Sequence, residues 1–278
     1  MNMGPPGPLP VSNGLNTRSA SERKYGQAFV TDGIQPMARP GVAARILMAI
    51  VAWAERLNLT FSKFENQCVY DNSLFPWVAE VEREWRKIRS ELDRVLPRKA
   101  DLATVQTISK DAEAITQDQG WKTFVLAGYA VRSERNIREC PETWRIMQNI
   151  PGLKTAMFSI FEPGKQLPPH RGPYNGVLRL HLGLLVPEPR DKVAIRFGTR
   201  VCHWEEGRVV IFDDAYEHDA WNHTDSVRVV LFVDFVKPLK FPANLVNWLL
   251  LNIAAFTPFM RDAAENQRKW ERRFYGEP

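Results

Sequence analysis

Short hydrophobic runs separated by turn signals fill the second half of the chain. Between residues 153 and 236 these runs are rich in β-branched and aromatic side chains, and Pro163-Gly164 and Glu206-Gly207 are among the turn signals. Five or more strands at this spacing are typical of a compact all-β sandwich or barrel. Because helices are predicted in the first half, the whole pattern indicates an α+β fold.

The clearest helical periodicity lies in residues 76–96. Hydrophobic side chains recur there at spacings of three and four, which places them on one face of a helix. They are Val78, Val81, Trp85, Ile88, Leu92 and Val95. Pro76 suits a first helical turn and Pro97 suits the end of a helix. We therefore predict one helix over this range, with its charged face in solvent.

Two stretches of the chain contain no charged residue. Residues 46–54 are too short to span a bilayer, which needs about 20 residues. Residues 241–260 are long enough, but three asparagines and two prolines make them a poor spanning helix. They fit a hairpin or an amphipathic helix at a membrane surface, and they fit a helix packed on the β core equally well.

Composition divides the chain into four segments. Twelve of the first 41 residues are Gly or Pro, so residues 1–40 cannot bury enough apolar surface to fold and are predicted to be a disordered tail. Residues 41–150 are predicted to form a helical N-terminal part that packs on the core. Residues 151–239 form the β core, and residues 240–278 an apolar helical segment with a basic tail.

Charge and cysteine content exclude several classes of protein. There are 37 Lys and Arg residues against 32 Asp and Glu, a net charge of +5, but no block of five or six basic residues marks a nucleic-acid-binding arm. Three cysteines, far apart and without a CxxC pair, are typical of reduced thiols. The N-terminus lacks the pattern of a secretory signal, so we expect a cytoplasmic location. The sequence does not indicate an oligomeric state.

All five histidines lie between residues 170 and 223. His170 and His218 each follow a predicted strand, 48 residues apart, and Arg228 lies ten residues further along. This order on β strands is the layout of non-haem Fe(II), 2-oxoglutarate-dependent oxygenases. Imidazoles hold ferrous iron and leave positions open, while a buried arginine binds the distal carboxylate of 2-oxoglutarate. Any one of these histidines alone would more simply be a hydrogen-bonded core or surface residue.

Residues 120–239 resemble the aspartyl/asparaginyl β-hydroxylase family, and the resemblance continues more loosely from residue 60. The matching segments include PPHRGPYN at 168–175, LRLHLGL at 178–184, WEEGRVVIFDD at 204–214 and EHDAW at 217–221. The resemblance implies a double-stranded β-helix core of the jelly-roll or cupin type. It further implies Fe(II) ligands at His170 and His218, and 2-oxoglutarate contacts at Ser159, Arg179, His181 and Arg228. His203 and His223 match no site of the family and are expected at the surface.

Gly172 stands where most oxygenases of this class carry a third ligand, in a His-x-Asp motif. A glycine cannot ligate, so either water fills the third position or a nearby acid reaches it. The candidate acids are Asp213, Asp214 and Asp219. The peptide-hydroxylating branch of the family also carries glycine here, so we do not interpret the site as lost.

The resemblance implies that Fe(II), 2-oxoglutarate and O2 are used to hydroxylate an unactivated C–H bond. We favour a membrane lipid as substrate, because residues 46–54 and 241–260 offer apolar surface and basic residues in both tails would attract anionic headgroups. The specific expectation is 2-hydroxylation of a fatty acyl chain, with an ornithine lipid favoured. The protein would then be peripheral on the inner face of the cytoplasmic membrane, in contact through residues 241–260.

Two other functions are considered. Within enzymes, the alternative is peptidyl aspartyl/asparaginyl β-hydroxylation, which the glycine at residue 172 favours. From a different class, the alternative is a non-catalytic membrane-associated binding protein with the same fold.

Overall fold

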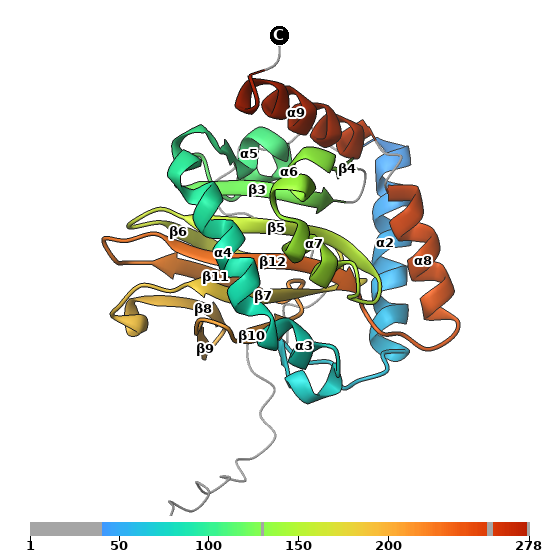
Figure 1. The fold of residues 1–278 in the computed structure, drawn as a ribbon. Helices are drawn as coiled ribbons and strands as arrows, with labels where there is room; N and C mark the ends of the chain where they lie inside the picture. The colour runs from blue at the N-terminus through green and yellow to red at the C-terminus, as the bar shows by residue number, and fades with distance from the viewer. Residues whose placement is uncertain (1–40, 129–130, 255–257, 277–278) are drawn as a thin grey trace, which may run out of the picture.

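The computed structural model describes residues 41–128, 131–254 and 258–276. Two antiparallel sheets lie face to face at its centre, and helices cover the outer face of the larger sheet (Figure 1). Residues 1–40, for which a disordered tail is predicted, lie outside the described residues.

Eight strands pass back and forth between the two sheets. They are β5 (Leu153–Phe161), β6 (Gln166–His170), β7 (Val177–Leu185), β8 (Val193–Phe197), β9 (Arg200–His203), β10 (Val209–Phe212), β11 (His218–Asn222) and β12 (Arg228–Val236). In the larger sheet the order is β10-β7-β12-β5, and in the smaller sheet it is β6-β11-β8-β9. All these pairings are antiparallel. This strand order is that of a double-stranded β-helix, so the predicted fold class is confirmed.

Four further strands extend the larger sheet and come from the first half of the chain. They are β1 (Val69–Tyr70), β2 (Ala103–Thr104), β3 (Trp121–Gly128) and β4 (Val131–Arg132). β1 pairs with β10, and β3 pairs with β5. The short strands β2 and β4 each pair with β3. The prediction of helices for residues 41–150 is therefore incomplete. A strand of two residues has no detectable period, and β3 is buried on both faces, so neither shows the alternation that marks a strand.

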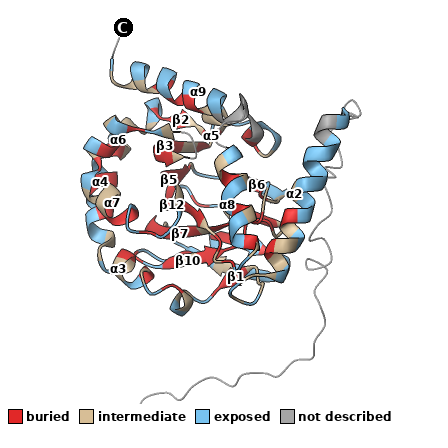
Figure 2. Ribbon diagram, turned by 90° about the vertical axis from the view of Figure 1, so that its right-hand side faces the viewer, coloured by how far each residue is buried: buried red, intermediate tan, exposed pale blue. Residues whose placement is uncertain are grey.

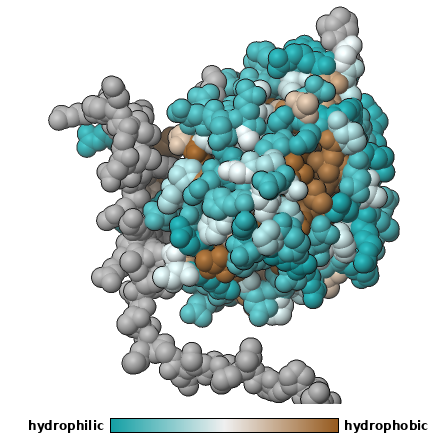
Figure 3. All heavy atoms as spheres, turned by 90° about the vertical axis from the view of Figure 1, so that its left-hand side faces the viewer, coloured by the Kyte–Doolittle hydropathy of each residue, from teal (hydrophilic) through white to brown (hydrophobic). Residues whose placement is uncertain are grey.

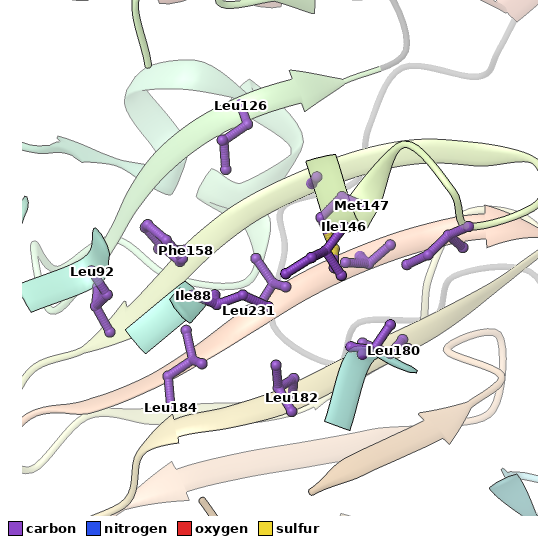
Figure 4. Packing of buried hydrophobic residues seen from close by; sticks show 14 of the residues in the cluster. Ile88, Leu92, Leu126, Ile146, Met147, Phe158, Leu180, Leu182, Leu184 and Leu231 are labelled. Atoms are coloured by element: carbon purple, nitrogen blue, oxygen red, sulfur yellow. The ribbon is translucent and has the colours of Figure 1, made fainter. Parts of the chain in front are cut away.

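The main hydrophobic core lies between the larger sheet and four helices. These are α3 (Val78–Arg83), α4 (Trp85–Val95), α6 (Glu134–Glu139) and α7 (Pro141–Met147); the shorter α5 (Val105–Ile108) lies near β2 and β3. Figure 4 shows Ile88 and Leu92 of α4 facing the leucines of β7 across this core. Since side chains alternate along a strand, Arg179 and His181 of β7 project to the other face, toward the smaller sheet.

The single helix predicted over residues 76–96 is wrong in one respect. It breaks at Glu84, whose backbone (φ −91°, ψ 3°) is not helical, and so forms α3 and α4. Directly after the break, Trp85 covers Gly207, where an added Cβ would lie 2.6 Å from the indole nitrogen. The hydrophobic spacing continues across the break, so the pattern does not reveal it. The predicted end before Pro97 is confirmed, because α4 ends at Val95.

Three helices lie beside and above the sheets. α2 (Val42–Thr60) and α8 (Ala243–Ala254) lie side by side at one end of the sheets, and α9 (Pro258–Phe274) crosses near β4 (Figure 1). Trp270 of α9 packs edge-on against Phe124, which fixes α9 to the core. Within the described ranges, no helix is both long enough and apolar enough to cross a membrane.

Candidate active site

Two histidines lie opposite each other in the smaller sheet. His170 ends β6, His218 begins β11, and the two residues are paired across the strands with ring centroids 4.4 Å apart. Nδ1 of His170 lies 2.8 Å from the carbonyl oxygen of Pro168. Nδ1 of His218 lies at the same distance from the carbonyl oxygen of Tyr216. A carbonyl only accepts hydrogen bonds, so each neutral ring donates from Nδ1 and presents the Nε2 lone pair, as a metal ligand does.

Burial keeps both rings neutral. Burial lowers the pKa of His170, and it lowers the pKa of His218 well below the ordinary value, with the neighbouring His170 ring as the next cause. A metal ion binds only the deprotonated imidazole nitrogen. The pair is therefore in the protonation state that binding requires at neutral pH.

A carboxyl group fills the space beside Gly172. A Cβ built on Gly172 would lie 2.2 Å from Oδ2 of Asp214, and the Gly172 N–H donates to the Asp214 carbonyl oxygen at 2.7 Å. Burial raises the pKa of Asp214 to about 7. Its Oδ2 lies 2.9 Å from Nη1 of Arg179, whereas its buried Oδ1 has no hydrogen-bond partner in the described structure. Oδ1 thus keeps the capacity to accept a hydrogen bond from a donor beside Gly172.

The two other candidate acids have partners elsewhere. Asp213 forms a buried ion pair with Lys237 at 2.8 Å. Asp219 receives two hydrogen bonds from Arg196, at 3.0 and 2.6 Å. Among the described residues no cluster of three His, Cys, Asp or Glu side chains could hold a metal ion. None of the three candidate acids therefore joins His170 and His218 in such a cluster.

Arg228, the first residue of β12, carries a buried guanidinium. The residue is 1% exposed, and its Nε and Nη1 have no hydrogen-bond partner in the part of the chain that the structure describes. The guanidinium carbon lies 3.6 Å from the ring centroid of Phe161 and 4.6 Å from that of Trp204. Burial lowers the pKa of Arg228 to about 9. Since an unpaired buried cation is costly, the site fits an anionic ligand that supplies the missing acceptors.

Two further polar side chains lie between the sheets near this guanidinium. His181 is buried, and neither ring nitrogen has a hydrogen-bond partner among the described residues. Burial lowers its pKa well below the ordinary value, with Arg228 as the next cause. The Ser159 hydroxyl accepts a hydrogen bond from Nε1 of Trp121 at 3.0 Å, so its own proton can be donated. Each of the two can thus offer a donor to a bound carboxylate.

Arg179 differs from the other predicted contacts because carboxylates already hold it. Its Nε donates to Oδ1 of Asp234 at 2.8 Å, and its Nη1 lies 2.9 Å from Asp214. Its guanidinium also stacks on the ring of Phe232 at 4.1 Å. These contacts make Arg179 a clamp that fixes the Asp214 carboxyl beside Gly172.

Aromatic contacts connect the two ends of the site. Ring centroids are 5.9 Å apart between His218 and Phe212, 4.9 Å between Phe212 and His181, and 5.8 Å between His181 and Trp204. Trp204 in turn packs on Arg228. A continuous chain of ring contacts therefore links the histidine pair to the guanidinium. Two neutral imidazoles and an unpaired guanidinium fit a ferrous ion chelated by a dicarboxylate.

Sequence reasoning missed several residues of this site. It did not assign Trp121 as the partner of Ser159, Trp204 as the ring over Arg228, or Asp234 as the partner of Arg179. Asp234 could have been identified, because a lone acid within the apolar strand β12 indicates a buried basic partner. His203 and His223 are exposed, as expected.

The sequence matches a family model and several known proteins. A family model described as aspartyl/asparaginyl beta-hydroxylase matches residues 82–238. The ornithine lipid ester-linked acyl 2-hydroxylase of Rhizobium tropici is 61% identical over 251 residues, which cover 90% of this chain and 89% of that protein. The human aspartyl/asparaginyl beta-hydroxylase is 34% identical over 166 residues, covering 58% of this chain and 21% of that protein.

Solved structures resemble the chain only distantly. A prolyl-4-hydroxylase from Pseudomonas putida matches with a TM-score of 0.39 and 16% identity, and the match covers 58% of this chain and 98% of that one.

Proposed function

The chain belongs to the aspartyl/asparaginyl β-hydroxylase family, and from this premise we propose that it is an Fe(II)- and 2-oxoglutarate-dependent hydroxylase. One observation carries the proposal: the buried guanidinium of Arg228 leaves Nε and Nη1 without a hydrogen-bond partner among the described residues, and ring contacts connect it to the His170 and His218 pair. A metal-chelating dicarboxylate would satisfy both features at once.

The residues at one end of the site would bind the metal, and those at the other end would bind the co-substrate. His170 and His218 would hold Fe(II) through Nε2. Arg228 neutralises the distal carboxylate of 2-oxoglutarate, while Ser159 and His181 donate hydrogen bonds to carboxylate oxygens. When bound, iron supplies the redox chemistry: one atom of O2 enters succinate as carbon dioxide leaves, and the other becomes the hydroxyl group that replaces hydrogen on the substrate carbon.

The surroundings of the metal position have two tasks. Phe161, Trp204 and Phe212 exclude bulk water from the space between the sheets. Arg179 holds Asp214 in place, so that Oδ1 can accept a hydrogen bond from water beside Gly172. A single protein side chain would then orient a water molecule at the position where a third protein ligand is missing.

For the substrate, we propose the ester-linked acyl chain of an ornithine lipid, hydroxylated at its second carbon. Support comes from the Rhizobium tropici relative, which acts on this class of lipid by its name and is covered over 89% of its length. The three cysteines of the chain are free thiols, which suits the inner face of the cytoplasmic membrane.

The direct test is a reconstituted reaction. The purified full chain is incubated with ornithine lipid, Fe(II), 2-oxoglutarate and oxygen, and the lipid is analysed by mass spectrometry. We expect a gain of one oxygen atom on the ester-linked chain and an equal amount of succinate. His170→Ala should abolish both products, whereas His203→Ala, which changes an exposed histidine outside the site, should leave them unchanged.

Peptidyl Asp/Asn hydroxylation remains the second candidate, because the human aspartyl/asparaginyl beta-hydroxylase is 34% identical over 58% of this chain. Lipid that stays unmodified, together with succinate release in the presence of an Asp- or Asn-containing peptide, would replace the lipid proposal with this one.

A further inference from the structure

Helix α8 exposes most of its large apolar side chains, instead of turning them toward the core. Its inward positions are Ala243, Asn247 and Leu251, which are buried. Its outward positions, which recur at spacings of three and four, hold large apolar side chains that are 50% to 61% exposed. They are Leu245, Trp248, Leu249 and Ile253. A surface helix normally turns such side chains toward the core, so this outward face indicates a partner outside the described chain.

Helix α2 carries exposed apolar side chains on more than one side. Ile46, Leu47 and Met48 are 58%, 57% and 52% exposed. Consecutive residues of a helix point about 100° apart, so these three cannot lie on a single face. Figure 2 shows this part of α2 projecting beyond the sheets, with exposed residues along its length. An apolar helix that is exposed on several sides fits a fluid hydrocarbon phase better than a flat protein surface.

The exposed apolar residues of the two helices lie at the same end of the molecule. α2 packs beside α8 (Figure 1), and the surface at this end consists of the outward positions of α8 together with the exposed apolar residues of α2, which are Ile46, Leu47, Met48, Ile50 and Trp53. We call this surface the α2/α8 face. The opposite side of the molecule is mostly hydrophilic, with apolar side chains restricted to a few areas (Figure 3).

Charges around the α2/α8 face favour an anionic lipid surface. α8 contains no charged residue, and α2 contains none between Arg45 and Glu55. Three exposed basic residues lie in or next to the two helices: Arg45, Arg56 and Lys240. Glu55 is largely buried and paired with Arg171, at 3.5 Å. Basic residues at the rim of an apolar surface, with tryptophans among its residues, are typical of proteins that seat on a bilayer.

Hydrogen bonds tie the α2/α8 face to the candidate active site. Residues 171–176 connect His170 at the end of β6 to β7. Asn58 of α2 donates to the Tyr174 hydroxyl and to Asn175 Oδ1, both at 3.0 Å. Asn247 of α8 donates to the carbonyl oxygen of Gly176 at 2.8 Å. The segment that leads away from one proposed iron ligand is therefore anchored to both helices.

We propose that the α2/α8 face seats the protein on a lipid bilayer, with Ile46, Leu47 and Met48 of α2 among the acyl chains and the basic margin at anionic headgroups. A protein seated in this way keeps the segment next to His170 at the membrane boundary, where acyl chains are accessible. The proposal rests on exposed surface and charge and does not require that the chain be an oxygenase.

Flotation of the full chain with lipid vesicles tests the proposal. Vesicles of phosphatidylcholine are compared with vesicles that also contain phosphatidylglycerol. The wild type should float with the mixed vesicles, and Ile46→Glu and Leu249→Glu should each lower the partition coefficient by about tenfold or more. The matched control is Val201→Glu, because Val201 is a 44% exposed residue on β9, away from both helices, and should bind as the wild type does.

Two outcomes would overturn the proposal. One is a wild type that stays in solution with both kinds of vesicle, or face variants that float as the wild type does. The other is a dimer in sedimentation velocity that dissociates on Ile46→Glu or Leu249→Glu while vesicles are not bound, since the face would then join two copies of the chain.

The readout also separates this proposal from the proposed function. Flotation needs neither iron nor 2-oxoglutarate, so it can be measured with His170→Ala as well. Vesicle binding without lipid hydroxylation would support membrane binding by the α2/α8 face and overturn the proposal of a lipid substrate. Hydroxylation of detergent-dispersed lipid by a chain that binds no vesicle would support the lipid substrate and overturn the proposed role of the α2/α8 face.

Discussion

The carboxyl group of Asp214 occupies the space into which a side chain at residue 172 would project. A Cβ on Gly172 would lie 2.2 Å from Oδ2 and 2.7 Å from Oδ1 of this buried carboxyl. Asp214 cannot easily move aside, because Arg179 holds it. The glycine is therefore required by packing, independently of any bound metal.

The first prediction concerns this contact. Gly172→Ala should lower the free energy of unfolding by about 1–3 kcal/mol, because the added methyl group forces the buried carboxyl or the backbone to shift. Chemical denaturation of the metal-free protein measures the change, so the result does not depend on activity.

The double variant Gly172→Ala, Asp214→Ala is the control for this prediction. Removing the carboxyl makes room for the methyl group, so Gly172→Ala should be less destabilising in the Asp214→Ala background than in the wild type. Equal effects in the two backgrounds would show that the two groups do not compete for space.

The second prediction concerns the buried charge of Arg228. In the absence of 2-oxoglutarate, Arg228→Met should raise the free energy of unfolding by about 1 kcal/mol or more, because an unpaired cation is replaced by an apolar side chain. The same variant should bind 2-oxoglutarate about 100-fold more weakly, because the charge-assisted hydrogen bonds are lost. Calorimetric titration and denaturation measure the two effects.

The combination of opposite effects is diagnostic of a ligand site. Arg200→Met, which changes an exposed arginine on β9, should alter neither quantity. An Arg228→Met protein that is less stable than the wild type and binds 2-oxoglutarate normally would assign Arg228 a structural role instead.

The third prediction is a pH dependence that originates at His181. Burial, and then Arg228 and Arg179, place the pKa of His181 well below its ordinary value of 6.5. The unfolded chain therefore takes up a proton before the folded chain does. The neutral ring therefore makes its full contribution to the free energy of unfolding above about pH 6.5. Below that pH the contribution is lost, by up to about 1.4 kcal/mol per pH unit.

His181→Phe tests this assignment. Phenylalanine suits a pocket already lined by Phe212, Phe232 and Trp204, and it does not titrate. Between pH 6.5 and pH 5, the free energy of unfolding should fall less steeply for this variant than for the wild type. If the free energy of unfolding falls equally steeply with pH in the variant and the wild type, the pKa of His181 is not lowered in the folded state.

Much of the core could be predicted from the sequence, because the signals are local. The apolar runs of β5, β7 and β12 are long enough to identify as strands, and the polar residues within them mark the face between the sheets. Arg179 and His181 alternate with leucines that are fully buried under the helices, which is why a strand can carry both a core and a site.

The remainder depends on contacts between distant parts of the chain. Trp121 reaches Ser159 only because β3 pairs with β5, and Trp204 reaches Arg228 only through the closing of the two sheets. The choice among three acids near Gly172 was open for the same reason. Asp213 and Asp214 are adjacent in sequence, yet one pairs with Lys237 and the other with Arg179.

The orientation of α8 was equally beyond the sequence. Residues 241–260 are compatible with a helix packed on the core and with one at a membrane surface, because Asn247 gives no indication of which face is buried. In the structure Asn247 is the buried residue, and Trp248 beside it is 61% exposed.

The most direct test of the account is the amount of ferrous iron bound by the purified chain under anaerobic conditions. With 2-oxoglutarate present, the wild type and His203→Ala should bind stoichiometric iron, and His170→Ala and His218→Ala should bind little. Stoichiometric iron in either of the last two variants would contradict a centre built on the facing rings of His170 and His218.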